Sequence, residues 1–219
     1  MKQVSSIRPN RIGWLEVDLD ETEMDYLWKC VEDAKKANND WKKKLVGVIS
    51  NSLKLEDRDS WFFRKVLVKL VQAYSDTFTD LGELDQMLPG PRHPIIMDGF
   101  WVNFQNQTEY NPGHVHKGIY SFVIWMKIPT KFKEQKKLPW ISTVNGGTES
   151  TVSNFRFEIQ TITGKVDTYT YQMSPEMEGK LLLFPADLRH EVFPFYNSNE
   201  ERVTISGNLS LDTSIILDS

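Results

Sequence analysis

The stretch ERVTISGNLSL, residues 201–211, alternates apolar and polar side chains. Neighbouring side chains of a β-strand point to opposite faces of its sheet, so this alternation predicts a strand with one apolar and one polar face. The stretch FWVNFQ, residues 100–105, alternates in the same way, with Trp101, Asn103 and Gln105 on its second face. A polar face can contact water outside a β-sandwich or line a cavity inside a barrel, and periodicity alone leaves both open.

Residues 95–211 contain seven segments with the composition of β-strands, separated by Gly, Pro, Asn and acidic turn signals. These segments are IIMDGFWVNFQ, GIYSFVIWMKIP, NFRFEIQTI, KVDTYTYQM, GKLLLFP, HEVFPFY and ERVTISGNLSL. No helical period intervenes between them. The pattern therefore favours an antiparallel sandwich or barrel over a parallel sheet.

The residues before this region have the pattern of helices. DETEMDYLWKCVEDAKKA, residues 20–37, predicts an amphipathic helix with acids in its first turn and lysines in its last. A second helix is expected to start at Asp59 or Ser60 and to run through residues 61–78, WFFRKVLVKLVQAYSDTF. We expect this helix to cover a sheet. LPGPRHP, residues 88–94, is expected to be a loop between this helical front, residues 1–94, and the strands.

Length and composition predict one globular domain over residues 1–219. The chain carries 30 acidic and 26 basic residues, and its net charge of −4 disfavours the broad positive field that nucleic-acid binding needs. The single cysteine, Cys30, cannot form an intrachain disulfide, and no signal-peptide pattern opens the sequence, so we expect a reducing cytoplasm. No stretch approaches the roughly 20 apolar residues of a membrane span.

Two of the four histidines, His114 and His116, stand one residue apart in PGHVHKGIYSFVIW, residues 112–125. In a strand, residues i and i+2 project to the same side, which brings both imidazoles within reach of one metal ion. The candidate for a third ligand is His190, which follows a buried apolar strand. His93 lies in a turn and is expected to be an ordinary surface residue.

The pair HVH followed by LLFPADLRHEVFPFYNSNEERVTISGN, residues 182–208, resembles the iron(II)- and 2-oxoglutarate-dependent oxygenases. More narrowly, it is similar to small stand-alone members, some encoded by bacterial viruses, in which L-x-x-FP-x-x-x-x-H-x-V-x-P and E-R-x-S-I-S-x-N recur. The resemblance covers roughly residues 95–211. It implies a mainly β fold, a double-stranded β-helix of the jelly-roll or cupin type, flanked by the N-terminal helices.

The resemblance also implies roles for individual residues. His114 corresponds to the first iron(II) ligand and His190 to the distal one. Arg202 corresponds to the basic residue that pairs with the far carboxylate of 2-oxoglutarate, which its planar fork can bind through two hydrogen bonds. Thr204 takes the neighbouring hydroxyl position. On this resemblance, the polar face of residues 201–211 lines a cavity.

The implied activity is hydroxylation of a small molecule or protein side chain by O2, coupled to decarboxylation of 2-oxoglutarate to succinate. Asn103, Trp101 and Tyr120 are candidates for contacts with the cosubstrate or substrate, Tyr120 because it shares strand parity with His116 if no bulge intervenes. Residues 131–150 form a loop that could set specificity, and together with the helical front they could form a lid or a homodimer surface.

The chain departs from the superfamily at His116, where most members carry a carboxylate two residues after the first histidine. Three possibilities stay open: a three-histidine iron site, a two-histidine site completed by water, and a site that prefers zinc or manganese. Asp187 and Glu191 could supply an oxygen ligand beside His190. Glu191 is the poorer candidate because adjacent strand residues face opposite ways.

Two alternatives to an oxygenase remain at this stage. One is a cupin-type metalloenzyme that does not use 2-oxoglutarate, although KGIYSF, which follows HVH, lacks a glutamate at the usual cupin offset. The other is a non-enzymatic β-sandwich that binds or assembles with a partner, in which the three histidines need not converge. The lysine clusters at residues 42–44 and 134–137 are expected to be solvated surface without a function.

Overall fold

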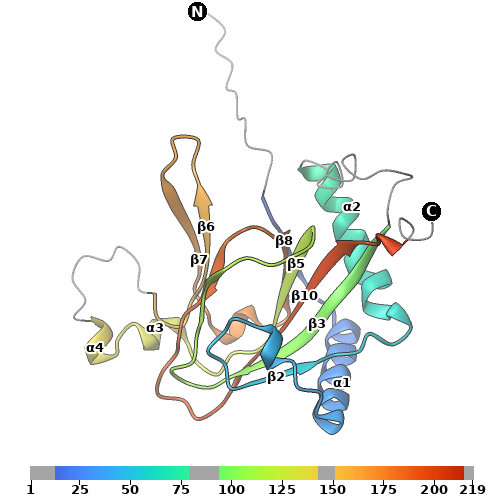
Figure 1. The fold of residues 1–219 in the computed structure, drawn as a ribbon. Coiled ribbons are helices and arrows are strands. Elements are labelled where there is room, and N and C mark those ends of the chain that lie inside the picture. Colours follow the sequence, from blue (N-terminus) through green and yellow to red (C-terminus); the bar gives the residue numbers. More distant parts are fainter. Residues whose placement is uncertain (1–12, 79–93, 143–150, 215–219) are drawn as a thin grey trace, which may run out of the picture.

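The computed structural model describes residues 13–78, 94–142 and 151–214, which form two antiparallel sheets (Figure 1). The six-stranded sheet has the order β1-β8-β5-β10-β3-β2, and the four-stranded sheet has the order β4-β9-β6-β7. The strands are β1 (Leu15–Asp18), β2 (Asn51–Lys54), β3 (Ile95–Gln105), β4 (Asn111–His114), β5 (Tyr120–Lys127), β6 (Phe155–Gln160), β7 (Val166–Tyr171), β8 (Lys180–Pro185), β9 (His190–Val192) and β10 (Arg202–Leu211). The predicted mainly β, double-stranded β-helix fold is confirmed.

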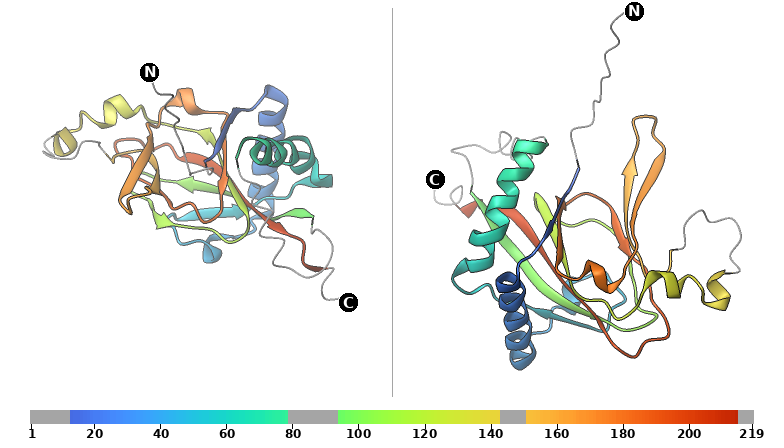
Figure 2. Two further views of the ribbon diagram at one scale, coloured as in Figure 1. Left: turned by 90° about the horizontal axis from the view of Figure 1, so that it is seen from above. Right: turned by 180° about the vertical axis from the view of Figure 1, so that it is seen from behind.

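Two helices cover the outer face of the six-stranded sheet, as the views in Figures 1 and 2 show. They are α1 (Glu21–Ala37) and α2 (Val68–Thr77), and a π-helical turn, η3 (Phe63–Leu67), leads into α2. The connections contain α3 (Phe132–Gln135), α4 (Pro139–Ser142), η1 (Lys42–Lys44), η2 (Arg58–Ser60) and η5 (Pro175–Met177). None of the helices in the part of the chain that the structure describes is long and apolar enough to cross a membrane.

A capping box fixes the start of the first helix, and Asn38, with a φ of 51°, ends it. The Asp20 side chain accepts a hydrogen bond from the Glu23 backbone N–H, and the Glu23 carboxylate accepts one from the Asp20 N–H, which is a capping box. The continuous helical stretch that contains η3 and α2 begins at Trp61, just after the predicted start at Asp59 or Ser60. Asp59 and Ser60 have φ values of 54° and 51°, which a right-handed helix excludes, so helical residues follow them.

The central strands β3 and β10 separate two packed regions. Their apolar faces, including Val102 and Ile205, pack with buried side chains of the helices such as Leu27 and Phe62. A second cluster around Trp125 lies between the two sheets. The register pairs Ile205 with Val102 and Thr204 with Asn103, so like faces of the two strands are aligned.

The seven segments predicted as strands are confirmed as β3 and β5 to β10. The description of residues 1–94 as a helical front is incomplete, because this region also supplies β1 and β2 to the six-stranded sheet. Each of these strands has only four residues, too few for alternation to be read from the sequence. The predicted loop at residues 88–94 lies almost wholly outside the described residues.

Gly207 sits in the middle of β10, where neighbouring atoms leave no room for a side chain. A Cβ atom at this position would lie 2.4 Å from the Phe122 ring and 2.6 Å from the carbonyl oxygen of Gly99. Glycine in a strand interior often marks such a close approach. We therefore expect Gly207→Ala to lower the free energy of unfolding by about 1–3 kcal/mol, measured from urea denaturation.

The matched control is Ser206→Ala, in the same strand, whose side chain faces the open space between the sheets. This change should alter the free energy of unfolding by no more than about 0.5 kcal/mol. Equal stability of the two variants would contradict the packing at Gly207.

Candidate metal and cosubstrate site

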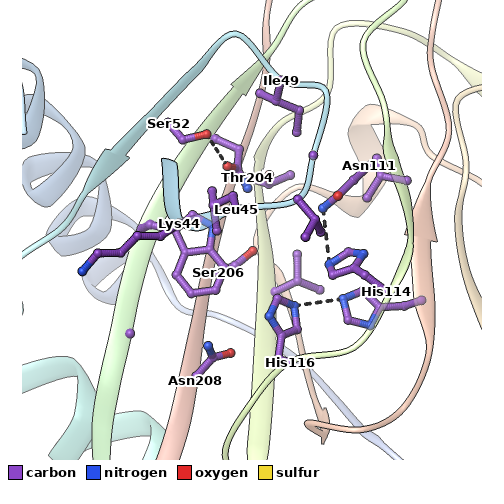
Figure 3. Close-up of a pocket in the computed structure, with 18 of the residues that line it drawn as sticks. Lys44, Leu45, Ile49, Ser52, Asn111, His114, His116, Thr204, Ser206 and Asn208 are labelled. Atoms are coloured by element: carbon purple, nitrogen blue, oxygen red, sulfur yellow. Dashed lines mark hydrogen bonds between the residues drawn. The ribbon is translucent and has the colours of Figure 1, made fainter. Parts of the chain in front are cut away.

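A cavity of about 610 Å³ opens between the two sheets (Figure 3). The polar faces of the two central strands line it: Trp101, Asn103 and Gln105 from β3, and Thr204, Ser206 and Asn208 from β10. The choice that periodicity left open is therefore decided by the structure, because these side chains face an internal cavity. Apolar side chains of the second cluster, among them Trp125 and Phe155, complete the wall.

Three histidines converge at this cavity. His114 and His190 are register partners of the antiparallel pair β4 and β9. His116 follows β4, and its backbone N–H donates a hydrogen bond to the Ala186 carbonyl at 2.8 Å. The candidate ligand atoms of the three imidazoles all lie within 4.8 Å of one another, close enough to hold one metal ion.

Backbone carbonyls orient two of these rings. Nδ1 of His114 lies 2.7 Å from the Pro112 carbonyl oxygen, and Nδ1 of His190 lies 2.8 Å from the Leu188 carbonyl oxygen. A carbonyl oxygen can only accept, so Nδ1 carries the hydrogen in both rings and Nε2 keeps its lone pair. This is the tautomer in which metal-binding histidines are usually held.

The distance between imidazoles also fits a shared ion. Nε2 of His116 lies 3.2 Å from Nε2 of His190 (Figure 3, dashed line). Two nitrogens that each lie about 2.1 Å from one ion, at angles between 90° and 110°, are separated by roughly 3.0–3.4 Å. The same distance also fits a hydrogen bond from Nε2–H of His116 to Nε2 of His190, and both arrangements place the two nitrogens at one point of the cavity.

Burial keeps these imidazoles neutral. It lowers the pKa of His114, lowers that of His116 to about 4, and lowers that of His190 well below the usual value of an imidazole. The positive charge that a neighbouring histidine would carry adds to the effect for His116 and His190. Neutral imidazole is the form that binds metal, so the site is ready for an ion at neutral pH.

No carboxylate joins the three histidines within residues 13–78, 94–142 and 151–214. Glu191 forms an ion pair with Arg156 instead, with Arg156 Nε 2.5 Å from the Glu191 carboxylate. This agrees with the expectation that neighbours in a strand face opposite ways. Asp187 is exposed and does not belong to the group. His93 lies outside the described residues.

Arg202 is fully buried at the start of β10. Its guanidinium donates to the carbonyl and hydroxyl oxygens of Ser153 at 2.8 and 2.7 Å and lies 3.5 Å from Gln105 Oε1. Nε has no hydrogen-bond partner, and no carboxylate within the described ranges pairs with the charge. Burial lowers the pKa of Arg202 to about 9, so the group is still a cation at neutral pH. Arg202 itself does not line the cavity, in contrast to the expectation for the polar face of residues 201–211, whereas its neighbour Gln105 does.

Of the predicted contacts with cosubstrate or substrate, Asn103 and Trp101 line the cavity and Tyr120 does not. Asn103 is held by a 2.7 Å hydrogen bond from Ser52, and Trp101 lies beside His116 with its buried Nε1–H unpaired among the described residues. Tyr120 packs in the helix-facing core against Tyr74. The parity argument for Tyr120 fails because the chain turns at Gly118, where φ is +101°, before β5 begins.

The sequence did not predict that residues 41–49 line the cavity. Trp41, Lys42, Lys44, Leu45, Val46, Gly47 and Ile49 all contribute to its wall. The segment is fixed to the start of β4, since the backbones of Val48 and Tyr110 exchange hydrogen bonds of 2.9 and 3.3 Å. Asn111, which lies 3.4 Å from Nε2 of His114, was also not predicted. Neither group has a sequence motif that would reveal its place.

Solved structures share this fold at low sequence identity. The non-heme α-ketoglutarate-dependent carbocyclase SnoK from nogalamycin biosynthesis matches with a TM-score of 0.55 and 7% identity, over 92% of this chain and 80% of that one. An oxidoreductase of the 2OG-Fe(II) oxygenase family from Burkholderia pseudomallei matches with a TM-score of 0.50 and 13% identity, over 90% and 84%. At these identities the likeness concerns the fold alone.

A family comparison goes further than the fold. No curated protein sequence matches the chain. Residues 99–208, however, match the model of a family described as "Putative 2OG-Fe(II) oxygenase". The matched region spans half of the chain and contains His114, His116, His190 and Arg202. The chain therefore belongs to the 2-oxoglutarate- and iron(II)-dependent oxygenase family.

Proposed function

We propose that the protein is a hydroxylase that holds iron(II) through His114, His116 and His190 and binds 2-oxoglutarate with the help of Arg202. One observation carries this proposal. Three neutral imidazoles meet at a cavity whose wall is backed by a buried arginine with no carboxylate partner in the described parts of the chain. The substrate that receives the hydroxyl group is not identified.

The donor set suits a divalent ion of the first transition row. Imidazole nitrogens bind iron(II), zinc and manganese, and the carbonyls of Pro112 and Leu188 hold two of the rings with Nε2 free. Three neutral ligands leave the full charge of the ion in the site, whereas the usual carboxylate would cancel part of it. The site consequently favours an anionic cosubstrate.

When bound, iron(II) with 2-oxoglutarate and O2 would supply the oxidising chemistry of the family, in which the cosubstrate is decarboxylated to succinate. The chain's own residues would bind and orient the cosubstrate and exclude water from the site. The Arg202 guanidinium would pair with the far carboxylate, which would relieve the cost of its unpaired buried charge. Asn103 and Thr204 would donate hydrogen bonds from the wall, and Trp101, beside His116, has an N–H with no partner among the described residues that could donate another.

The three-imidazole donor set is also compatible with one competing function. A cupin-type metalloenzyme could use zinc or manganese at the same histidines without 2-oxoglutarate. Arg202 favours the oxygenase, because in the competing function a buried cation would have no anion to bind. Convergence of the histidines speaks against the non-enzymatic sandwich, which gives them no reason to meet.

We also propose a reducing, cytoplasmic location, since the only cysteine of the sequence, Cys30, is a buried free thiol. The acidic net charge of −4 supports a partner other than nucleic acid. A single domain over residues 1–219 and a homodimer remain predictions from the sequence.

Each of the three histidines should be needed for metal-dependent stabilisation. Without oxygen, iron(II) at 100 times its Kd should raise the Tm of the metal-free protein by roughly 5–10 °C. His114→Ala, His116→Ala and His190→Ala should each remove most of this rise, as followed by differential scanning calorimetry. His93→Ala is the control and should keep the full rise. A full rise in His116→Ala would mean that two histidines and water form the site.

Arg202→Met should weaken 2-oxoglutarate binding by roughly 10- to 100-fold, because a charge-assisted pair is lost. The measurement is the visible charge-transfer band of the anaerobic iron(II) protein, titrated with 2-oxoglutarate. Methionine fills much of the buried volume, so the fold and iron binding should be retained. Arg58→Met, an exposed arginine away from the cavity, is the control. Absence of any band in the iron-loaded wild type would favour the cupin-type function.

A further inference from the structure

Lysines surround the opening of the cavity. Lys42 and Lys44 belong to η1 and Lys117 follows His116, and all three are exposed while lining the cavity. They therefore stand where the cavity meets solvent. Figure 3 shows Lys44 and Leu45 across the cavity from His114 and His116. The lysine cluster at residues 42–44, which the sequence suggested to be solvated surface, thus belongs to the approach to the histidines.

The segment that carries these lysines has a defined position. Its far end is joined to Tyr110 through Val48, and a Cβ atom on Gly47 would lie 3.0 Å from Asn111 Oδ1. At its near end, Lys44 Nζ lies 4.1 Å from the centre of the Trp41 ring, a cation–π contact that directs the lysine. The segment that carries Lys42 and Lys44 is consequently held at the opening, and the Trp41 ring positions the Lys44 side chain.

The charge at the opening is unbalanced. Asp98 is the one acidic residue of the described chain that lines the cavity, and it already accepts a 2.7 Å hydrogen bond from Ser210. Among the described residues, none of the three lysine ammonium groups forms an ion pair, and the Asp40 carboxylate accepts its 2.8 Å hydrogen bond from the backbone N–H of Lys42. The whole chain, in contrast, has a net charge of −4. Positive charge gathered at the opening of an acidic protein concentrates the positive electrostatic potential there, which attracts anionic ligands to the cavity.

Apolar side chains stand beside these charges. Val46 and Val115 line the same cavity and are 63% and 52% exposed. Exposed apolar groups at the edge of a cavity are typical of ligand contacts. A ligand that satisfies both features carries a negative charge next to an apolar portion.

We propose that Lys42, Lys44 and Lys117 form a binding subsite for an anionic group, a carboxylate or phosphate, of the hydroxylated substrate. This inference rests on the proposed function, since it assumes that the cavity admits a substrate to the histidines. The anionic group pairs with the lysines at the opening, the apolar portion packs on Val46 and Val115, and the uncharged reacting portion extends toward His116. Lysine ammonium groups act here as point charges that accept either anion.

The test compares charged probes with uncharged counterparts by calorimetry, on protein held with zinc and saturating 2-oxoglutarate so that no turnover occurs. The pairs are 4-phenylbutyrate and its amide, phenethyl phosphate and phenethyl alcohol, and a capped Val-Glu-Glu-Val peptide and its glutamine counterpart. The three pairs distinguish a small acid, a phosphate and an acidic peptide as the source of the anion.

We expect at least one anionic probe to bind the wild type about tenfold more tightly than its counterpart at low salt, and less so at high salt. The variant K42Q/K44Q/K117Q should lose this preference and keep its Tm, because all three side chains are exposed. The control K133Q/K136Q/K137Q removes the same charge from exposed lysines that do not line the cavity, and should keep the preference.

The subsite would be overturned if every anionic probe bound the wild type no more tightly than its uncharged counterpart. It would also be overturned if K133Q/K136Q/K137Q lost the preference for the anionic probes as completely as K42Q/K44Q/K117Q. This failure can be told apart from failure of the proposed function. If 2-oxoglutarate itself does not bind, the hydroxylase proposal falls, while the difference between the two lysine variants still reports on the opening.

Discussion

The two-residue alternation of β3 and β10 over residues 100–105 and 202–208 is the constraint on which the rest of the structure depends. Their register places Ile205 opposite Val102 on the helix-facing side and Thr204 opposite Asn103 on the cavity side. A slip of one residue would turn the polar side chains into the apolar core and the apolar ones into the cavity. Burial of one face under α1 and α2 thus also determines what lines the site, so the same interaction stabilises the fold and forms the cavity.

The electrostatics of the site follow from burial rather than from pairing. Three imidazoles are kept neutral by desolvation, and Arg202 remains a cation without a carboxylate partner among the described residues. Burying a charge is unfavourable unless other groups compensate it, and here Ser153 accepts two hydrogen bonds from the guanidinium, which also lies over the Phe195 ring. A divalent ion at the three neutral imidazoles would add to the same positive field. The proposed cosubstrate contact of Arg202 and the proposed lysine subsite would both favour negatively charged ligands.

Backbone atoms position and orient the histidines. The pairing of β4 with β9 brings His114 beside His190, and the carbonyls of Pro112 and Leu188 fix which nitrogen of each ring is free. Ligands held in this way lose little conformational freedom on binding. Because these contacts come from the main chain, they depend on the path of the strands more than on neighbouring side chains.

The sequence by itself predicted the seven strands β3 and β5 to β10 and the two covering helices, because alternation and helical period are local signals, and its resemblance to a known family singled out the three histidines and Arg202. Only the tertiary structure decided that the polar strand faces line a cavity, that residues 41–49 cross its opening, and that Glu191 turns to Arg156. It also removed Tyr120 from the site, since the turn at Gly118 breaks the parity that joins it to His116. These features depend on which segments meet in space, and short edge strands and turns leave no period in the sequence from which such meetings could be read.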